Sequence, residues 1–305
     1  MSLRPRSPKQ RLLRVYRTLP SFQQSGVAVE LAKRLTRLPV SVGPWRPVFI
    51  IGCARSGTSV LKRLLGAHPD IDAYPSEANE LWHPSSYPWT PSEHRTPPLW
   101  QAPAEFTADS IAHWPTAHGE RIRRVFGWHQ RLRRRPVFLG KSSMINFMLA
   151  DVARLFPDAR FIHIVRDGRA VALSYAEKEH RKLLAAPDDY RAAGACYDKD
   201  ALIRHMAGFW QATLAEINGT SATLDWTADG RCRVCRYEDL CGDPIRTLTG
   251  LLAFIGVERP LPALKEPLRD MNHKFRESLA PELLLELTET LAPTLAAQGY
   301  DAAPT

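Results

Sequence analysis

One loop near the start of the chain constrains the fold more than any other feature. Residues 47–59 read PVFIIGCARSGTS, an apolar run followed by a glycine-containing turn and the start of a helix. This order predicts a buried strand that leads into a helix N-terminus. Free backbone N–H groups and the positive end of the helix dipole favour a phosphate at such a point. We therefore expect a phosphate-binding loop on an α/β sheet.

This loop differs from the ATP-binding loop at one position. From Gly52 to Ser59 it nearly follows the pattern G-x-x-x-x-G-K-[ST], but Thr58 occupies the position of the lysine. The loop keeps the residues that hold a phosphate and lacks the cation that reaches the β- and γ-phosphates of a nucleoside triphosphate. Its positive charge lies earlier, at Arg55. We therefore expect it to bind a phosphorylated nucleotide other than ATP.

A second strand–turn–helix unit supplies another candidate phosphate site. Residues 161–165 form a short apolar run rich in β-branched residues, and Arg166 follows at its carboxyl end. Ser174 lies about two turns into the helix expected after it. Ligands of open α/β sheets bind beyond the carboxyl ends of the strands. Two such sites fit a nucleotide that carries phosphates at both ends.

The rest of the chain alternates strands with helices. Further strands are expected over residues 137–141 and 233–237, and helices over residues 57–68, 142–156, 198–218, 243–255 and 282–297. The sequence Asn218-Gly-Thr220 is interpreted as the turn that ends one of these helices. The alternation predicts an α/β fold of the P-loop type, three layers α/β/α with a mostly parallel central sheet flanked by helices.

The chain is expected to form one domain with two additions. Residues 47–305 carry the strand–helix pattern, and residues 1–46 form a basic N-terminal leader. Within the domain, residues 82–115 are rich in proline, tryptophan and histidine without a clear period. Long irregular segments of this kind are commonly binding loops or lids. We therefore interpret residues 82–135 as an insertion that binds the acceptor, the second substrate beside the nucleotide.

Composition restricts the cellular compartment and the kind of ligand that we expect. The 305 residues include 41 basic and 32 acidic side chains, a net charge of +9 that suits a polyanionic ligand. No apolar run has the length of a membrane span, and no signal-peptide core follows the basic N-terminus, so we expect a cytoplasmic protein. The five cysteines are unevenly spaced, and Cys232 and Cys235 have no matching second pair. Buried thiols are therefore favoured over a zinc site.

Together these motifs resemble the sulfotransferase family that uses 3′-phosphoadenosine-5′-phosphosulfate (PAPS). The loop from Gly52 to Ser59 looks like the 5′-phosphosulfate loop of that family, and Arg166 with Ser174 looks like its 3′-phosphate motif. Residues 156–163 and 236–244 add to the likeness. The resemblance implies an enzyme that moves a sulfonate group from PAPS to an acceptor hydroxyl or amine by in-line displacement. The products are the sulfated acceptor and adenosine 3′,5′-bisphosphate, and no metal is needed.

Among branches of the family, the likeness is to the tyrosylprotein sulfotransferases and related bacterial enzymes. It rests on residues 68–70, 165–169 and 274–301. The acidic cluster after residue 70 is shifted by one position, and Lys141 is followed by Ser-Ser rather than x-Pro. These departures leave the acceptor open between a small molecule, a glycan, a lipid-linked group and a peptide tyrosine. The basic leader is compatible with peripheral contact with a membrane surface, and no nucleic-acid partner is expected.

The resemblance also implies a nucleotide site. The residues expected around the nucleotide are Arg55, Ser56, Gly57, Thr58, Ser59, Arg166, Ser174, Tyr237 and Lys274. Those from 55 to 59 are expected to hold the 5′-phosphate and sulfonate, and Arg166 with Ser174 the 3′-phosphate. Tyr237, interpreted as the last residue of a strand, is expected to contact the adenine. Lys274 is expected to reach the phosphates from the C-terminal loop.

Catalysis is assigned to Arg55, Lys141 and Glu77 on the same basis. Lys141 is expected to stabilise charge on the leaving group and the sulfonate. Glu77 is expected to be the general base that accepts the proton of the acceptor hydroxyl, with Glu80, a histidine such as His83, or no base as the alternatives. Asn146 is left open between positioning a ligand and lying on a helix surface.

Two other functions are compatible with parts of the sequence. A P-loop kinase or other NTPase has a similar loop, but Thr58 and the lack of a clear aspartate-ended strand argue against it. A non-catalytic nucleotide-binding protein fits the basic leader and the net charge. The presence of Lys141 and Glu77 argues against this second alternative.

Overall fold

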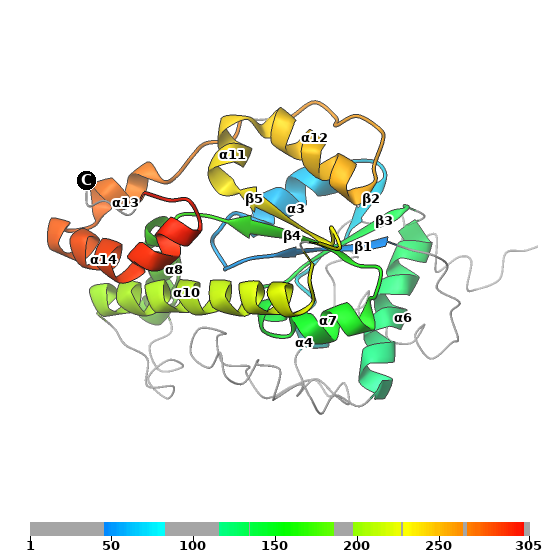
Figure 1. Cartoon of the computed structure of the whole chain (residues 1–305), viewed down its shortest axis with the longest axis horizontal. Helices are drawn as coiled ribbons and strands as arrows, with labels where there is room; N and C mark the ends of the chain where they lie inside the picture. Colours follow the sequence, from blue (N-terminus) through cyan, green and yellow to red (C-terminus); the bar gives the residue numbers. More distant parts are fainter. Residues whose placement is uncertain are drawn as a thin grey trace, which may run out of the picture.

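A five-stranded sheet forms the centre of the protein (Figure 1). The computed structural model describes residues 46–82, 116–133, 135–185, 198–226, 228–264 and 267–301. The strands are β1 (Arg46–Ile51), β2 (Ile71–Ala73), β3 (Val137–Lys141), β4 (Arg160–Val165) and β5 (Cys232–Arg236). Their order is β2-β3-β1-β4-β5, and every neighbouring pair is parallel. The predicted parallel sheet is confirmed.

The central strands are mostly apolar, as expected for a parallel sheet that helices cover on both faces. Successive side chains of a strand point to opposite faces. Phe49 of β1 and Phe161 of β4 therefore belong to one hydrophobic cluster, and Ile50 and Ile162 to the other. In Figure 1 the first face is covered by the helices drawn below the sheet and the second by those drawn above it. This is the predicted three-layer α/β/α arrangement.

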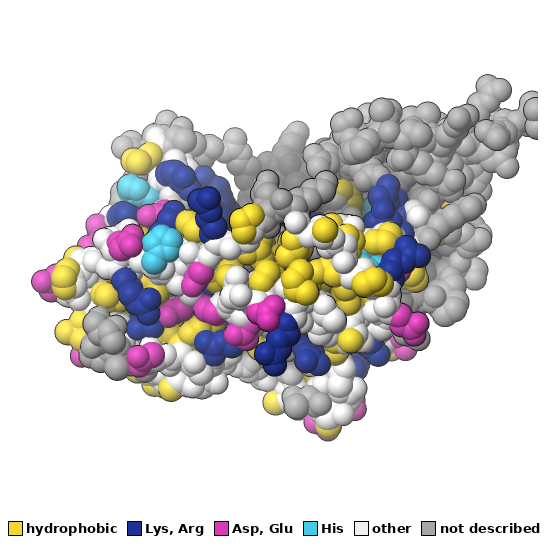
Figure 2. Space-filling view, turned by 90° about the horizontal axis from the view of Figure 1, so that it is seen from above, with side chains coloured by type: hydrophobic (Ala, Val, Ile, Leu, Met, Phe, Trp, Pro, Cys, Tyr) yellow, Lys and Arg dark blue, Asp and Glu magenta, His cyan; other side chains and the backbone are white. Residues whose placement is uncertain are grey.

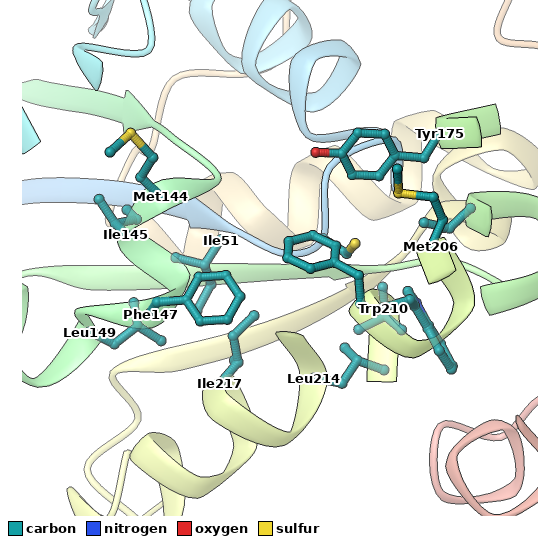
Figure 3. Packing of buried hydrophobic residues seen from close by; sticks show 14 of the residues in the cluster. Ile51, Met144, Ile145, Phe147, Leu149, Tyr175, Met206, Trp210, Leu214 and Ile217 are labelled. Carbon is teal, nitrogen blue, oxygen red and sulfur yellow. The ribbon is translucent and has the colours of Figure 1, made fainter. Parts of the chain in front are cut away.

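The two helical layers differ in size. The smaller layer consists of α3 (Thr58–Gly66), α11 (Tyr237–Gly242) and α12 (Pro244–Ile255). The larger layer includes α6 (Thr116–Arg133), α7 (Leu149–Leu155), α8 (Gly168–Ala185), α10 (Lys199–Thr223) and α14 (Pro281–Ala297). Figure 3 shows part of the larger core, where Ile51 at the end of β1 lies with Phe147 and with Ile217 of α10.

Two local structures differ from those expected. The helix expected over residues 142–156 is split into a 3-10 turn, η4 (Met144–Phe147), and α7, because Met148 between them leaves the helical conformation. Asn218 does not end a helix, since α10 continues to Thr223. Ile217 and Leu224, on either side of Gly219, pack against the larger hydrophobic cluster, and this burial outweighs the roughly 1 kcal/mol by which a helical glycine is disfavoured relative to alanine.

Residues 1–45 of the leader and most of the insertion lie outside the described residues, and Arg46, the last residue assigned to the leader, begins β1. The described parts of the insertion are Trp82, the last residue of α4 (Asn79–Trp82), α6 and residue 135. Asp72 of β2, which is buried, ties α6 to the edge of the sheet, because its carboxylate lies 3.0 Å from His129 Nε2 and accepts from Arg133 Nε at 3.1 Å.

None of the described helices is both long and apolar enough to cross a lipid bilayer. Figure 2 views the face that carries α11 and α12, where hydrophobic side chains gather near the middle and charged side chains of both signs surround them.

Candidate active site

The loop between β1 and α3 is shaped by two glycines that no other residue could replace without strain. Gly52 has a φ of 139° and Gly57 a φ of 96°. A Cβ atom on Gly52 would overlap the carbonyl oxygen of Ile164, and one on Gly57 would come within 2.7 Å of Cδ2 of Tyr237. The loop therefore wraps closely against β4 and the start of α11, and the approach requires glycine.

The start of α3 presents donors that no side chain of the helix caps. Gly57 is the N-cap residue and offers no side-chain hydrogen bond, so the first-turn N–H groups keep their free donor capacity. Ser56 is buried, and its hydroxyl has no hydrogen-bond partner among the described residues. Donors of this kind at a helix N-terminus suit an anion.

Asn146 fixes the first residue of this loop. Its Nδ2 donates to the Gly52 carbonyl at 2.9 Å, and the Gly52 N–H donates to its Oδ1 at 3.0 Å. Asn146 lies in η4 and is only 1% exposed, so the helix-surface alternative is wrong. Its amide holds the loop backbone rather than facing either pocket described below.

The end of β4 brings the second predicted motif against the first. Arg166 is 6% exposed, and its Nη1 donates to the Arg55 carbonyl at 3.1 Å. In turn, Nε of Arg55 donates to Ser174 Oγ on α8 at 3.1 Å. The guanidinium of Arg166 lies over the ring of Tyr237, 4.4 Å from its centroid. The residues predicted for the two phosphate sites therefore contact one another directly.

These residues surround a pocket of about 380 Å³, which we call the phosphate pocket. It is lined by eight of the nine residues predicted for the nucleotide, Arg55, Gly57, Thr58, Ser59, Arg166, Ser174, Tyr237 and Lys274. Ser56, the ninth, is buried behind them. Arg181 adds a further cation that was not predicted, and Glu177 adds a carboxylate. The excess of cations favours an anionic ligand.

The positions of Arg181 and Glu177 could have been inferred from Ser174. They follow it by seven and three residues on α8, so the three side chains share one face of the helix. Tyr237 is at a different local position from the one predicted, because it begins α11 rather than ending β5. Its hydroxyl donates to the Arg269 carbonyl at 3.1 Å, and burial raises its pKa to about 12.

A second pocket of about 540 Å³, the Lys–Glu pocket, holds the predicted catalytic pair. Its lining includes Ser59, Lys62, Arg63, Tyr74, Glu77 and Lys141. Lys141 is buried at the carboxyl end of β3, and its ammonium donates to the carboxylate of Glu77. The Glu77 side chain is 41% exposed. Since Ser59 lines both pockets, the pair adjoins the phosphate pocket.

Lys62 belongs to this pocket and was not predicted. Its Nζ donates to the Ser76 carbonyl, immediately before Glu77, at 3.0 Å. Burial, followed by repulsion from Lys141, lowers the pKa of the Lys62 ammonium to about 8, and Glu77 opposes this shift. Lys62 follows Ser59 by three residues on α3, so helix periodicity was the available signal. The side chains of Glu80 and His83, the alternative bases, lie outside what the structure describes.

The cysteines are free thiols in the described part of the chain. Burial raises the pKa of Cys235 to about 12 and of Cys232 to about 11, so both are protonated near neutral pH. Within the described ranges, no group of three or more His, Cys, Asp or Glu side chains is placed to hold a metal ion.

Comparison with known proteins finds similarity to sulfotransferases. A family model described as "Sulfotransferase family" matches residues 47–260. A protein-tyrosine sulfotransferase from Drosophila melanogaster is 26% identical over 222 residues, which cover 69% of this chain and 38% of that protein. Carbohydrate sulfotransferase 2 from Mus musculus is 29% identical over 147 residues, 35% of this chain and 26% of that protein. The chain therefore spans well under half the length of these curated relatives.

Solved structures share the fold. A sulfotransferase from Mycobacterium avium superimposes with a TM-score of 0.54 at 15% identity, over 90% of this chain and 81% of that one. A sulfotransferase domain from the curacin biosynthetic pathway gives a TM-score of 0.51 at 18% identity, over 75% of this chain and 82% of that one. At such identities the likeness concerns the fold alone.

Proposed function

The chain belongs to the sulfotransferase family, and on that premise we propose that it transfers a sulfonate group from PAPS to an acceptor hydroxyl or amine. Adenosine 3′,5′-bisphosphate is the other product. The observation that supports this most directly is the convergence of Arg55, Arg166 and Ser174 on one pocket. A ligand with phosphates at two ends needs cations and hydroxyls from two strand ends, and these residues supply them.

The residues present fit such a donor. The 5′-phosphosulfate end is assigned to Arg55, Thr58 and Ser59, where the start of α3 lacks a side-chain cap and Gly57 lines the phosphate pocket. Thr58 in place of a lysine suits a ligand without a triphosphate. Ser56 offers a buried hydroxyl without a partner in the described structure, another donor at the same loop. The 3′-phosphate is assigned to Arg166 and Ser174, and Lys274, which lines the same pocket, is assigned to the phosphates. The ring of Tyr237 packs against the Arg166 guanidinium and also lines the phosphate pocket.

The donor supplies an activated sulfuryl group when bound, and the protein supplies position and charge. In-line transfer requires the acceptor oxygen to lie opposite the leaving phosphate. The two pockets meet at Ser59. The side chains of Glu77 and Lys141 therefore lie beside the end of the phosphate pocket where the reaction is proposed.

Each catalytic group has one task in this proposal. Glu77 accepts the proton of the acceptor hydroxyl on a carboxylate oxygen. Lys141 and Arg55 offset the negative charge that develops on the leaving oxygen, a role that does not require a metal ion. The acceptor is assigned to the Lys–Glu pocket, lined also by Tyr74, Pro75 and Arg63. Relatives are named for protein tyrosine and for carbohydrate, so phenolic and sugar hydroxyls are both within the proposal.

Product formation from PAPS tests the function across several acceptor classes at once. The purified chain is incubated with labelled PAPS and a panel of tyrosine peptides, simple phenols, glycans and lipid-linked sugars, and adenosine 3′,5′-bisphosphate is quantified. We expect release that depends on one acceptor class and label on that acceptor. Nucleotide binding without transfer to any member of the panel would favour a non-catalytic nucleotide-binding protein instead.

A further inference from the structure

The carboxylate of Glu238 joins three segments behind the phosphate pocket. It accepts hydrogen bonds from Asn272 Nδ2 at 2.6 Å, Tyr300 Oη at 2.9 Å and the backbone N–H of Asp167 at 3.3 Å. Glu238 lies in α11, Asp167 follows β4, and the other two residues lie in the C-terminal part of the chain. Glu238 does not line the phosphate pocket and has no part in the proposed chemistry.

Glu238 decides which end of the Asn272 amide faces Arg166. An ionised carboxylate only accepts hydrogen bonds, so the amide must turn its NH₂ group toward Glu238. The Asn272 oxygen then points the other way and accepts from Arg166 Nε at 2.8 Å. Asn272 is buried, at 8% exposed, and the arrangement is thereby shielded from competing water.

Arg166 is consequently held on several sides. Nε is bound by Asn272, Nη1 donates to the Arg55 carbonyl, and the face of the guanidinium rests on the Tyr237 ring. In the part of the chain that the structure describes, Nη2 has no protein acceptor, and Arg166 lines the phosphate pocket. A side chain ordered in advance loses less conformational entropy when a ligand binds.

We propose that Glu238 is a positioning residue for recognition of the 3′-phosphate. Through Asn272 it sets the direction of the Arg166 guanidinium, and through Tyr300 and the Asp167 N–H it ties the C-terminal segment to the β4–α8 turn. The inference rests on the proposed function in one respect, since it takes the anion bound by Arg166 to be the 3′-phosphate of the nucleotide. The expected consequence is that selectivity for a 3′-phosphate depends on Glu238.

The test compares two nucleotides that differ only in that phosphate. Calorimetry measures the binding of adenosine 3′,5′-bisphosphate and of adenosine 5′-monophosphate to the full chain and to Glu238→Ala, which removes both acceptor oxygens. We expect the variant to bind the bisphosphate about tenfold more weakly, the effect of one hydrogen bond to a charged group, with the monophosphate changed less than about twofold. Asp239→Ala is the matched control, because it removes a carboxylate from the exposed neighbouring residue and should change neither affinity.

Further variants separate the explanations. Asn272→Ala removes the intermediate amide and should reproduce the loss of selectivity, and it also serves if Glu238→Ala does not fold. A Glu238→Ala protein that keeps the preference of the parent, or that loses affinity for both nucleotides equally, would overturn the positioning role while leaving the proposed function intact. A parent protein without preference for the bisphosphate would overturn the 3′-phosphate assignment itself.

Discussion

The phosphate pocket and the Lys–Glu pocket share Ser59 but are built in different ways. The phosphate pocket is formed by a loop that requires glycine at two positions, by Arg166 at the end of β4 and by residues of α3, α8, α11 and α13 (His273–Ser278). The Lys–Glu pocket depends on side-chain contacts made to the short segment between β2 and α4, which carries Glu77. The first pocket therefore combines a glycine-dependent backbone with side chains from several elements, whereas the second depends on a few long side chains around one short segment.

A pocket that holds the phosphates of the donor can stay the same whatever the acceptor is, whereas the side chains around the second pocket can vary with the acceptor. Lys62 and Lys141 approach the Glu77 segment from α3 and β3, and Ser142 Oγ donates to Asn79 Oδ1 at 2.9 Å. Variants in the two pockets should therefore separate binding of the nucleotide from transfer.

The largest expected effect is in the Lys–Glu pocket. Lys141→Met should lower the rate of sulfonate transfer by about 100- to 1000-fold, because a preorganised cation is removed from the developing charge. Bisphosphate affinity should change less than about threefold, since Lys141 does not line the phosphate pocket. Steady-state rates and calorimetry on the same protein check both statements. Lys199→Met, at the start of α10, is the control. Equal losses of binding and rate would contradict the separation of the pockets.

At Gly57, in the loop between β1 and α3, we expect a smaller effect on transfer and a direct effect on nucleotide binding. Gly57→Ala places a Cβ 2.7 Å from Tyr237 in a backbone conformation with φ of 96°. We expect about 1–3 kcal/mol lower free energy of unfolding, as for other strained backbone positions. Bisphosphate binding should weaken as well. Denaturant unfolding and calorimetry measure the two effects. Gly208→Ala in α10, where a Cβ meets nothing within 4 Å, should not destabilise the protein.

The smallest expected effect concerns Lys62 and pH. Its pKa is lowered to about 8 in the folded protein from 10.5, so between these values the unfolded chain binds more protons than the native state. Stability contributed by this site therefore rises as pH increases from about 8 toward 10.5. The melting temperature of the parent should rise relative to that of Lys62→Met across this range. A difference that stays constant from pH 7 to 10 would show that Lys62 is not desolvated beside Lys141.

Much of the phosphate pocket could be predicted from the sequence because its residues follow local patterns. Arg55 and Ser59 belong to a strand–turn–helix motif, and Arg166 with Ser174 to a second one. Residues whose partners are distant in the chain gave no such signal. Asn146 contacts Gly52 across 94 positions, and Asn272 reaches Arg166 across 106.

The fold could also be predicted from local patterns in the sequence, and the errors of that prediction are local. Alternating apolar runs and helical periods specify the parallel sheet and its layers. They do not specify where a helix ends when packing outweighs propensity, as α10 shows by continuing past Asn218. Nor do they show whether a residue after a strand, such as Tyr237, still pairs in the sheet or begins a helix. Residues 1–45 of the leader and residues 83–115 stay predictions, since they lie outside the described structure.

The central claim is that the phosphate pocket holds a nucleotide with phosphates at both the 5′ and 3′ positions. Isothermal titration calorimetry with adenosine 3′,5′-bisphosphate, beside ATP with magnesium, tests it most directly. We predict micromolar binding of the bisphosphate, weak binding of ATP, and loss of about tenfold or more in bisphosphate affinity in Arg166→Ala. Tighter binding of ATP with magnesium than of the bisphosphate would contradict the claim and would favour a P-loop kinase or NTPase.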